Sequence, residues 1–448
     1  MTNSTAAAAP PTGPMLILSA RPPWRETFVS LRIPNYRRFT AGNLVANTAA
    51  WMQRIAMDWL VLQLSGSVAA VGVTVFMQFA PMLLFGLWGG VIADRHSKQR
   101  LLIITQSASA ALAALLAVLT LSGTVEVCHV YLISFALGLV TVVDNPARQV
   151  FVNELVGPRH LRNAISLNSS IFQLGGLIGP ALAGLMIAAV GGGWSFAINA
   201  VACLAVVAAL LALRKGELHH SPAAPRGKGQ LAEGIRYVRR KPVIFWTVVM
   251  VAVLAVFAFN MPVFLAAYAN EVFDAGAQGY GIFNALVAAG ALAGALSSTR
   301  RTSVRLSTVI GTAATLGIVQ TLAGFAPDEV AFSVLLVGIG VGNLLFITAA
   351  NSLVQMSSNV QIRGRAISVY ILVLLGGQAL GGPLMGWVVE ALGPHSAMAV
   401  SGLVPTAAAI VVGLLIARGT NLRLRLRRSG RMPVVTIVTR AGKAGPTL

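Results

Sequence analysis

Residues 69–100 read AAVGVTVFMQFAPMLLFGLWGGVIADRHSKQR, an uncharged apolar run that ends in a basic segment. A helix of about 20 apolar residues crosses the roughly 30 Å of hydrocarbon in a bilayer. The run from 69 to 92 is long enough for this, and the charges begin only at Asp94. The stretch therefore predicts one membrane-spanning helix followed by a charged loop.

The same pattern recurs along all 448 residues. The chain is 56% hydrophobic and 10% charged, with a mean hydropathy of +0.77, whereas soluble domains carry about 25% charged residues. Strands of a membrane β-barrel are shorter and alternate in polarity. The sequence thus predicts an all-α polytopic membrane protein with 12 transmembrane helices, at 39–63, 69–92, 101–122, 127–147, 164–190, 194–213, 244–267, 280–298, 306–325, 330–350, 367–389 and 395–417.

The charges alternate from loop to loop. Of the 33 Lys and Arg residues, 32 fall in the arm, the alternate loops and the tail, and the charged residues of the remaining loops are all acidic. The positive-inside rule then predicts a protein of the cell membrane with both termini on the cytoplasmic side. The net charge of +20 follows from this topology and favours contact with anionic lipids, so no nucleic-acid partner is expected.

One long polar stretch divides the predicted helices six and six. We expect a cytoplasmic arm (1–38), a first six-helix bundle (39–213), a linker (214–243), a second bundle (244–417) and a basic tail (418–448). The linker segment LAEGIRYVRR has the pattern of an amphipathic surface helix. The tail segment NLRLRLRRSGR fits either a segment on the inner leaflet or a solvated basic tail.

The two halves resemble each other when the sequence is shifted by about 202 residues. Internal repeats of this kind are typical of two-half transporters, and small residues four apart let helices approach closely. The repeat predicts two pseudo-symmetric bundles with glycines at the helix interfaces, where the alternatives are a sliding contact and static packing. The residues concerned are Gly86, Gly175, Gly179, Pro180, Gly184, Gly290, Gly294, Gly377 and Gly381.

The segment GGVIADRHSKQR (89–100) resembles the loop signature of the major facilitator superfamily, and GGLIGPALAG (175–184) resembles the helix-five pattern of its exporters. The stretches WMQRIAMDWLVLQLSGS and DNPARQVFVNEL are similar to the branch with the enterobactin exporter and multidrug permeases. The resemblance implies a gating loop in which Asp94 meets nearby cations and the helix that begins near Gly364. The gating residues are Gly90, Asp94, Arg95, Lys98 and Arg100, with Asp144 and Arg148 as a gate or capping pair.

Two charges lie inside the first predicted span, in WMQRIAMDWL (51–60). Arg54 and Asp58 share one helix face with Asn43 and Asn47, and a charge in the bilayer centre costs about 2.5–3.5 kcal/mol on insertion scales. At a spacing of four the two can pair. Either they form a structural ion pair, or they form a cavity site that exchanges a proton. The basic residue that many proton-coupled exporters carry in mid helix four is absent here.

The function predicted from these features is secondary active transport. We expect a monomeric, proton-coupled exporter of small amphipathic molecules, and the alternatives are an importer, a lysophospholipid flippase or a receptor. No nucleotide-binding or hydrolase motif occurs, so neither an enzyme nor a cofactor or metal is expected. Further candidates for the cavity are Gln173, Asn260, Asn284, Asn351 and Gln378, each of which could instead join helices by hydrogen bonds.

Overall fold

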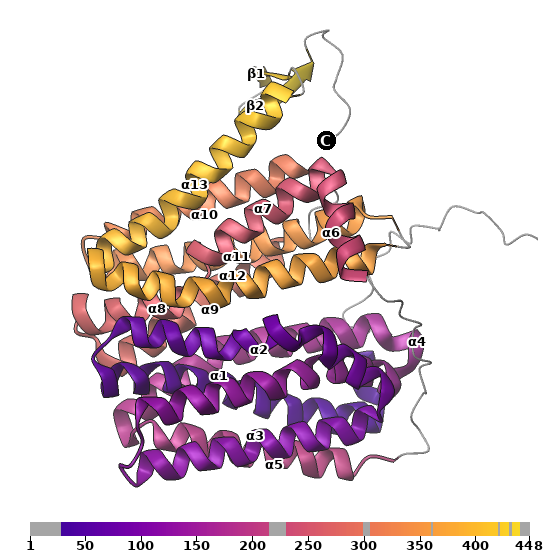
Figure 1. Ribbon diagram of the computed structural model, residues 1–448, viewed down its shortest axis with the longest axis vertical. Helices are drawn as coiled ribbons and strands as arrows, with labels where there is room; N and C mark the ends of the chain where they lie inside the picture. Colours follow the sequence, from indigo (N-terminus) through magenta and orange to yellow (C-terminus); the bar gives the residue numbers. More distant parts are fainter. Residues whose placement is uncertain are drawn as a thin grey trace, which may run out of the picture.

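The chain folds into two helical bundles stacked side by side (Figure 1). The computed structural model describes residues 28–214, 230–298, 305–359, 362–419, 422–429 and 432–439. In the first bundle, a short 3₁₀ turn precedes five helices. They are η2 (Val29–Arg32), α1 (Pro34–Ser65), α2 (Val68–Arg95), α3 (Lys98–Leu121), α4 (Val127–Val190) and α5 (Gly193–Leu211).

The second bundle follows a short helix that runs across the ends of the long ones, α6 (Gln230–Arg240) (Figure 1). It contains a π-helical turn, η4, between two of its helices. Its elements are α7 (Pro242–Phe257), α8 (Met261–Ala267), η4 (Tyr268–Val272), α9 (Gly276–Ser298), α10 (Leu306–Gly324), α11 (Glu329–Ser357), α12 (Arg363–Leu392) and α13 (Pro394–Gly419).

Helix α4 contains two membrane spans, Val127–Gly157 and Asn163–Val190. We had expected a loop from 148 to 163, but helical structure continues to Gly157, where φ is +66°. Only glycine adopts this backbone region readily, so the chain turns back at that residue. The seventh predicted span is also interrupted, because α7 ends at Phe257 and α8 begins at Met261.

The part of the chain that the structure describes contains twelve segments long enough to span a membrane, as the sequence predicted. Eleven are apolar enough to be recognised by composition, and α1 is the twelfth. Its 32 residues extend about 48 Å at 1.5 Å per residue, enough to cross a bilayer. Its hydropathy is low because it carries polar side chains, among them Gln53, Arg54 and Asp58.

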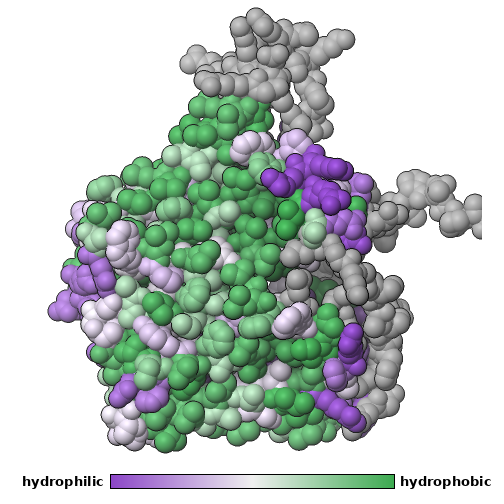
Figure 2. All heavy atoms as spheres, in the orientation of Figure 1, coloured by the Kyte–Doolittle hydropathy of each residue, from purple (hydrophilic) through white to green (hydrophobic). Residues whose placement is uncertain are grey.

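The two ends of the molecule differ in charge. We name the end at which α1 begins the basic face, because it holds residues such as Arg95, Arg214 and Arg363. The opposite end, the acidic face, holds Glu126, Asp328 and other carboxylates. Figure 2 shows a broad hydrophobic surface between these ends, with hydrophilic residues gathered at both. This is the surface expected of a protein embedded in lipid.

The bundles meet along two helix pairs, α2 with α12 and α4 with α9. Near the acidic face these pairs approach at glycines: a Cβ added to Gly281 would lie 2.7 Å from the Cα of Gly184, and one added to Gly382 would lie 2.6 Å from the carbonyl oxygen of Gly72. The core of the second bundle also includes Trp59 of the first. The acidic face is therefore closed by direct backbone packing.

The tail contains two strands, β1 (Leu422–Ser429) and β2 (Met432–Thr439), which pair antiparallel with Leu422 opposite Thr439. We had expected only a basic segment here. The alternation of Leu and Arg has the period of two that is typical of a strand, and this explains the difference.

Candidate functional site

Asp58 of α1 lies at the boundary between the two bundles. Its side chain is buried, with 1% of its surface exposed. Gln78 of α2 donates a hydrogen bond to Oδ1 at 3.4 Å, and the hydroxyl of Tyr280 donates to Oδ2 at 3.4 Å. Because Tyr280 belongs to α9, this one carboxylate connects the first bundle with the second.

Arg54 does not pair directly with Asp58, which corrects the ion pair expected from their spacing. Its guanidinium lies 4.8 Å from the ring centroid of Trp51 and 6.0 Å from that of Phe79. In the described part of the chain it has no ion pair within 4.0 Å. Arginine stacks well on aromatic faces, so the side chain turns toward these rings. The three side chains are only partly buried.

An aromatic pair covers Asp58 toward the acidic face. The rings of Trp59 and Tyr280 stack with centroids 5.7 Å apart and an interplanar angle of 27°. The indole N–H of Trp59 is buried and has no hydrogen-bond partner among the described residues. Together with the glycine contacts of α4 and α9, this pair separates Asp58 from the acidic face.

Asp144 and Arg148 form a second polar group, entirely within the first bundle. Oδ2 of Asp144 lies 2.8 Å from a terminal guanidinium nitrogen of Arg148. Oδ1 accepts hydrogen bonds from Thr105 at 2.7 Å and from Gln106 at 2.9 Å, and Arg148 also donates to Asn43. Every partner lies on α1, α3 or α4, so the group joins helices of one bundle and does not reach the other.

Five of the predicted cavity amides have protein partners, and one of them is Asn43, which accepts from Arg148 and donates to Asn168 at 3.1 Å. The side-chain nitrogen of Asn47 donates to the Ile171 carbonyl at 3.0 Å, that of Asn260 to Val256 at 2.9 Å, and that of Asn284 to Tyr280 at 2.8 Å. The oxygen of Asn351 accepts from Gln355 at 2.8 Å. These contacts join neighbouring helices or lie within one helix.

Gln173 and Gln378 differ from the other amides. Each is partly exposed, and neither side chain has a hydrogen-bond partner among the described residues. They come from α4 and α12, one in each bundle. Of the predicted amides, these two have donors and acceptors free to bind a ligand.

Most of the predicted interface glycines pack inside a bundle. A Cβ added to Gly179 would lie 2.7 Å from the Thr48 carbonyl oxygen, and one added to Gly294 would lie 2.9 Å from that of Val341. Gly175 faces α1, and Gly290 faces α11. Gly377 and Gly381 both face α7. Gly86 meets only Met82 of its own helix. Of the predicted set, Gly184 and the carbonyl oxygen of Pro180 contact the other bundle.

The predicted gating loop lies at the basic face. Arg95 and Arg100 are exposed, and Nζ of Lys98 lies 3.9 Å from a carboxylate oxygen of Glu154 on α4. Gly90 and Asp94 are in the last turns of α2, but the side chain of Asp94 lies outside the described ones. The contact between Asp94 and α12 therefore stays a prediction.

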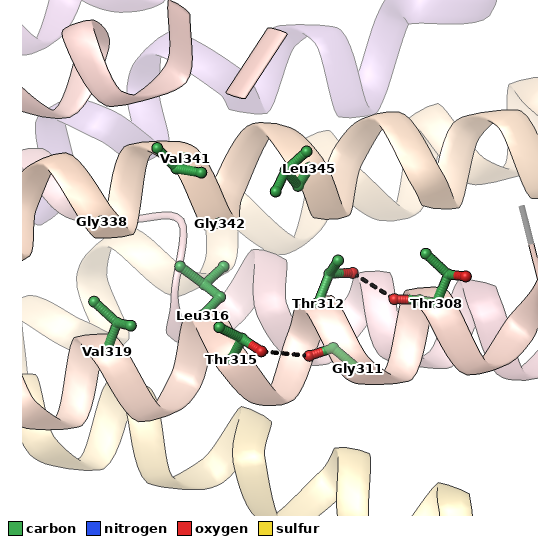
Figure 3. Close-up of a pocket in the computed structure, with 10 residues that line it drawn as sticks. All are labelled: Thr308, Gly311, Thr312, Thr315, Leu316, Val319, Gly338, Val341, Gly342 and Leu345. Carbon is green, nitrogen blue, oxygen red and sulfur yellow. Dashed lines mark hydrogen bonds between the residues drawn. The ribbon is translucent and has the colours of Figure 1, made fainter. Parts of the chain in front are cut away.

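Two other features fit a ligand site less well than Asp58 does. A groove of about 570 Å³ lies between α10 and α11 (Figure 3). The hydroxyls of Thr312 and Thr315 in this groove donate to backbone oxygens of their own helix. No titratable residue lines the groove.

Glu126, Cys128 and His129 have potential metal-ligand atoms within 4.8 Å of one another. However, Nδ1 of His129 already accepts the backbone N–H of Glu126 at 3.1 Å.

The sequence analysis missed Gln78, Tyr280 and Trp59. Gln78 is the one amide in the apolar run from 69 to 92, a signal of the kind that singled out the other amides. Tyr280 and Trp59 are aromatic residues near span ends, where such residues are common. Their contact across the bundles depends on the tertiary structure.

Comparison with known proteins places the chain in a family. The family described as transmembrane secretion effector matches residues 25–433. The multidrug efflux pump Tap of Mycolicibacterium fortuitum is 27% identical over 366 residues, which cover 79% of this chain and 88% of Tap. The enterobactin exporter EntS of Salmonella typhimurium is 22% identical over 387 residues, covering 86% and 91%. The staphyloferrin A transporter of Staphylococcus aureus is 36% identical over 139 residues, only 35% of that protein.

Solved structures show the same fold. A bacterial homolog of the human lysosomal transporter Spinster, in an inward-facing and unoccupied conformation, has a TM-score of 0.62 at 15% identity and covers 86% of this chain and 96% of that one. The nucleoside transporter NupG has a TM-score of 0.67 at 14% identity and covers 85% and 99%. The chain therefore belongs to the transmembrane secretion effector family of the major facilitator superfamily, and it is a multi-pass membrane transporter rather than an enzyme.

Proposed function

We propose that this transporter is a proton-coupled exporter of small amphipathic molecules, with Asp58 as the residue that carries the proton. The observation that carries the proposal is the position of Asp58: its carboxylate receives hydrogen bonds from both bundles, at 3.4 Å from Gln78 and from Tyr280. A buried carboxylate inside a membrane span is costly and is a functional candidate by default.

The environment of Asp58 depends on the state of the transporter. In the described state the acidic face is closed and Tyr280 reaches Asp58 from the second bundle. Opening of that face separates α9 from α1, removes this donor and admits water to the carboxylate. Proton binding that differs between two states shifts the balance between them, and this is the physical basis of the coupling.

The substrate is inferred from the side chains beside Asp58. Trp51 and Phe79 offer aromatic surface, and Arg54 adds one cation between them. The unpartnered amides of Gln173 and Gln378 could add hydrogen bonds. Such a set suits a bulky, amphipathic molecule of weak charge, and the multidrug and siderophore transport named for Tap and EntS fits this class.

Orientation and direction belong to the same proposal. The positive-inside rule makes the basic face cytoplasmic, so both termini lie in the cytoplasm and the described state is closed to the outside. Export is inferred from the efflux and export functions named for Tap and EntS. Import, or lysophospholipid flipping by the same fold, is the alternative.

The test compares three proteins in inverted membrane vesicles: the unchanged transporter, Asp58→Asn, and Asp58→Asn with Arg54→Gln. Uptake of a labelled panel of amphipathic compounds is measured with and without a proton gradient. Because an amide cannot exchange a proton, we expect both variants to lose gradient-driven uptake entirely. Downhill movement should persist, and membrane amounts should stay similar.

A double variant with unchanged gradient-driven uptake would end the coupling proposal. Orientation is checked with the native Cys128, which is exposed at the acidic face, while Cys203 is buried. A membrane-impermeant thiol reagent should label Cys128 in intact cells and not in sealed inverted vesicles. Cys128→Ser serves as the control, and labelling from the opposite side would reverse the topology.

A further inference from the structure

Helices α2 and α12 run antiparallel across the boundary between the bundles (Figure 1). α2 begins at Val68 at the acidic face, and α12 ends there at Leu392. The two are in close contact near this end, since a Cβ added to Gly386 would lie 2.7 Å from the Cα of Ala69. The last turn of α12 therefore lies beside the first turn of α2.

Because the two helix ends are adjacent, the carboxylate of Glu390 on α12 reaches the first residues of α2. Its Oε1 accepts a hydrogen bond from the Ser67 hydroxyl at 2.5 Å and one from the Ala69 backbone N–H at 3.1 Å. Ser67 is the N-cap of α2, and its hydroxyl oxygen also accepts the N–H of Ala70 at 3.1 Å. The first N–H groups of a helix lack partners within the helix and carry partial positive charge, so a carboxylate is well placed there.

We propose that Glu390 is a positioning residue for the transport cycle: it holds the two bundles together at the acidic face and must release α2 before that face opens. We call Glu390 with Ser67 and Ala69 the acidic-face latch. The other end of the same antiparallel pair is where Asp94 is predicted to face the beginning of α12. That predicted contact would give each helix of the pair a carboxylate at the N-terminus of its partner.

The nearby charges make this assignment specific. Glu271 of η4 interacts electrostatically with Glu390, but it is not hydrogen-bonded to α2. In the part of the chain that the structure describes, Glu390 has no ion pair with a basic residue. The hydrogen bonds from Ser67 and Ala69 are therefore its attractive polar contacts, and both cross the boundary between the bundles.

The test measures the distance between the bundles at the acidic face. Spin labels are placed on cysteines introduced at Leu64 and Val330, which are exposed on opposite bundles, in a Cys128→Ser background without a proton gradient. Glu390→Ala should shift the balance toward the longer distance by about three- to tenfold, the usual size of hydrogen bonds and helix-terminus contacts of this type. Glu390→Gln should give a smaller shift, because it keeps an acceptor and loses the charge.

Glu271→Gln is the matched control, since it removes a neighbouring carboxylate that does not touch α2; it should not increase the longer distance. A second readout is transport: the apparent KM for substrate at the basic face should rise in Glu390→Ala, because a smaller fraction of molecules is open to that side. Unchanged distances in Glu390→Ala, or an equal shift in Glu271→Gln, would overturn the proposal. All variants are compared at one pH and keep Asp58, so any contribution of Asp58 protonation is common to them, and this proposal and the coupling proposal can fail separately.

Discussion

Asp58 and Asp144 are both buried aspartates of the first bundle, and their surroundings differ. Asp144 has an ion pair with Arg148 and hydrogen bonds from Thr105 and Gln106, all within the bundle. Asp58 has two longer hydrogen bonds from neutral side chains, and one of them comes from the second bundle. The first carboxylate keeps its partners however the bundles move, and the second does not.

This difference is the one expected between a structural charge and the coupling residue proposed above. A buried charge whose partners move with it in one rigid body adds to the stability of that body. Its environment does not change during the transport cycle. A buried charge whose partner sits on the other rigid body changes its environment each time the two separate. Burial alone therefore does not distinguish Asp58, which we propose as the coupling residue, from Asp144, whereas the location of their partners does.

The largest expected effect comes from truncating each aspartate in turn and comparing the two single variants. Asp144→Ala leaves Arg148, whose side chain is 17% exposed, without its counter-charge, so we expect a loss in the free energy of unfolding that approaches the roughly 3–5 kcal/mol of a fully buried pair. Asp58→Ala removes two hydrogen bonds from neutral donors, each worth about 0.5–1.5 kcal/mol, and Arg54 keeps its contacts with Trp51, so its loss should be smaller, about 1–3 kcal/mol. Unfolding in mixed micelles measures both values.

The control for this comparison is the double change Asp144→Asn with Arg148→Gln. Removing both charges together should recover a large part of the lost stability, because no unpaired charge remains. Equal losses for Asp58→Ala and Asp144→Ala would mean that both residues are structural.

The next effect compares glycines between bundles with glycines inside one. A side chain at Gly281 would meet the backbone of Pro180 and Gly184 at 2.7 Å, and one at Gly290 would come closer still to the carbonyl oxygen of Val337. Overpacking of this kind costs about 1–3 kcal/mol. We expect Gly281→Val to oppose closure of the acidic face, and Gly290→Val to reduce the free energy of unfolding.

The measurements are the spin-label distance across the acidic face and thermal unfolding. Gly281→Val should lengthen the distance with little change in melting temperature, because the bundles can separate and relieve the contact. Gly290→Val should do the reverse, because α9 and α11 belong to one bundle. If both variants lower the melting temperature equally, the contact between the bundles is not a moving one.

The sequence predicted the twelve spans because length and hydropathy are local properties. It also predicted the division into halves, since the glycine repeat is visible at a fixed shift. It placed a loop at 148–163 where helical structure continues to Gly157, because charged residues such as Arg148 suggested an end to the helix. The glycine followed by a proline at 157–158 marks the turn more accurately.

The site was predicted only in part. Arg54 and Asp58 were recognisable because charges in an apolar run are rare. Their partners were not, since nothing in the sequence states which face of α9 meets α1. The expected pairing of Arg54 with Asp58 followed from helix periodicity, but the arginine turned to Trp51 and Phe79 instead. Tertiary packing places these rings beside Arg54, and so it determines the direction in which the arginine side chain points.

The smallest expected effect tests the hydrogen bond that crosses the bundles. Tyr280→Phe removes the hydroxyl that donates to Asp58 and keeps the ring that stacks on Trp59. A hydrogen bond of this kind is worth about 0.5–1.5 kcal/mol, so the spin-label balance should move toward the open acidic face by a few-fold. Tyr268→Phe is the matched control, because that hydroxyl donates at 3.3 Å to the Gly324 carbonyl inside the second bundle. Removal of that hydroxyl should lower stability by a similar amount and leave the distance unchanged. An equal change of distance in both variants would show that Asp58 does not sense the separation of the bundles.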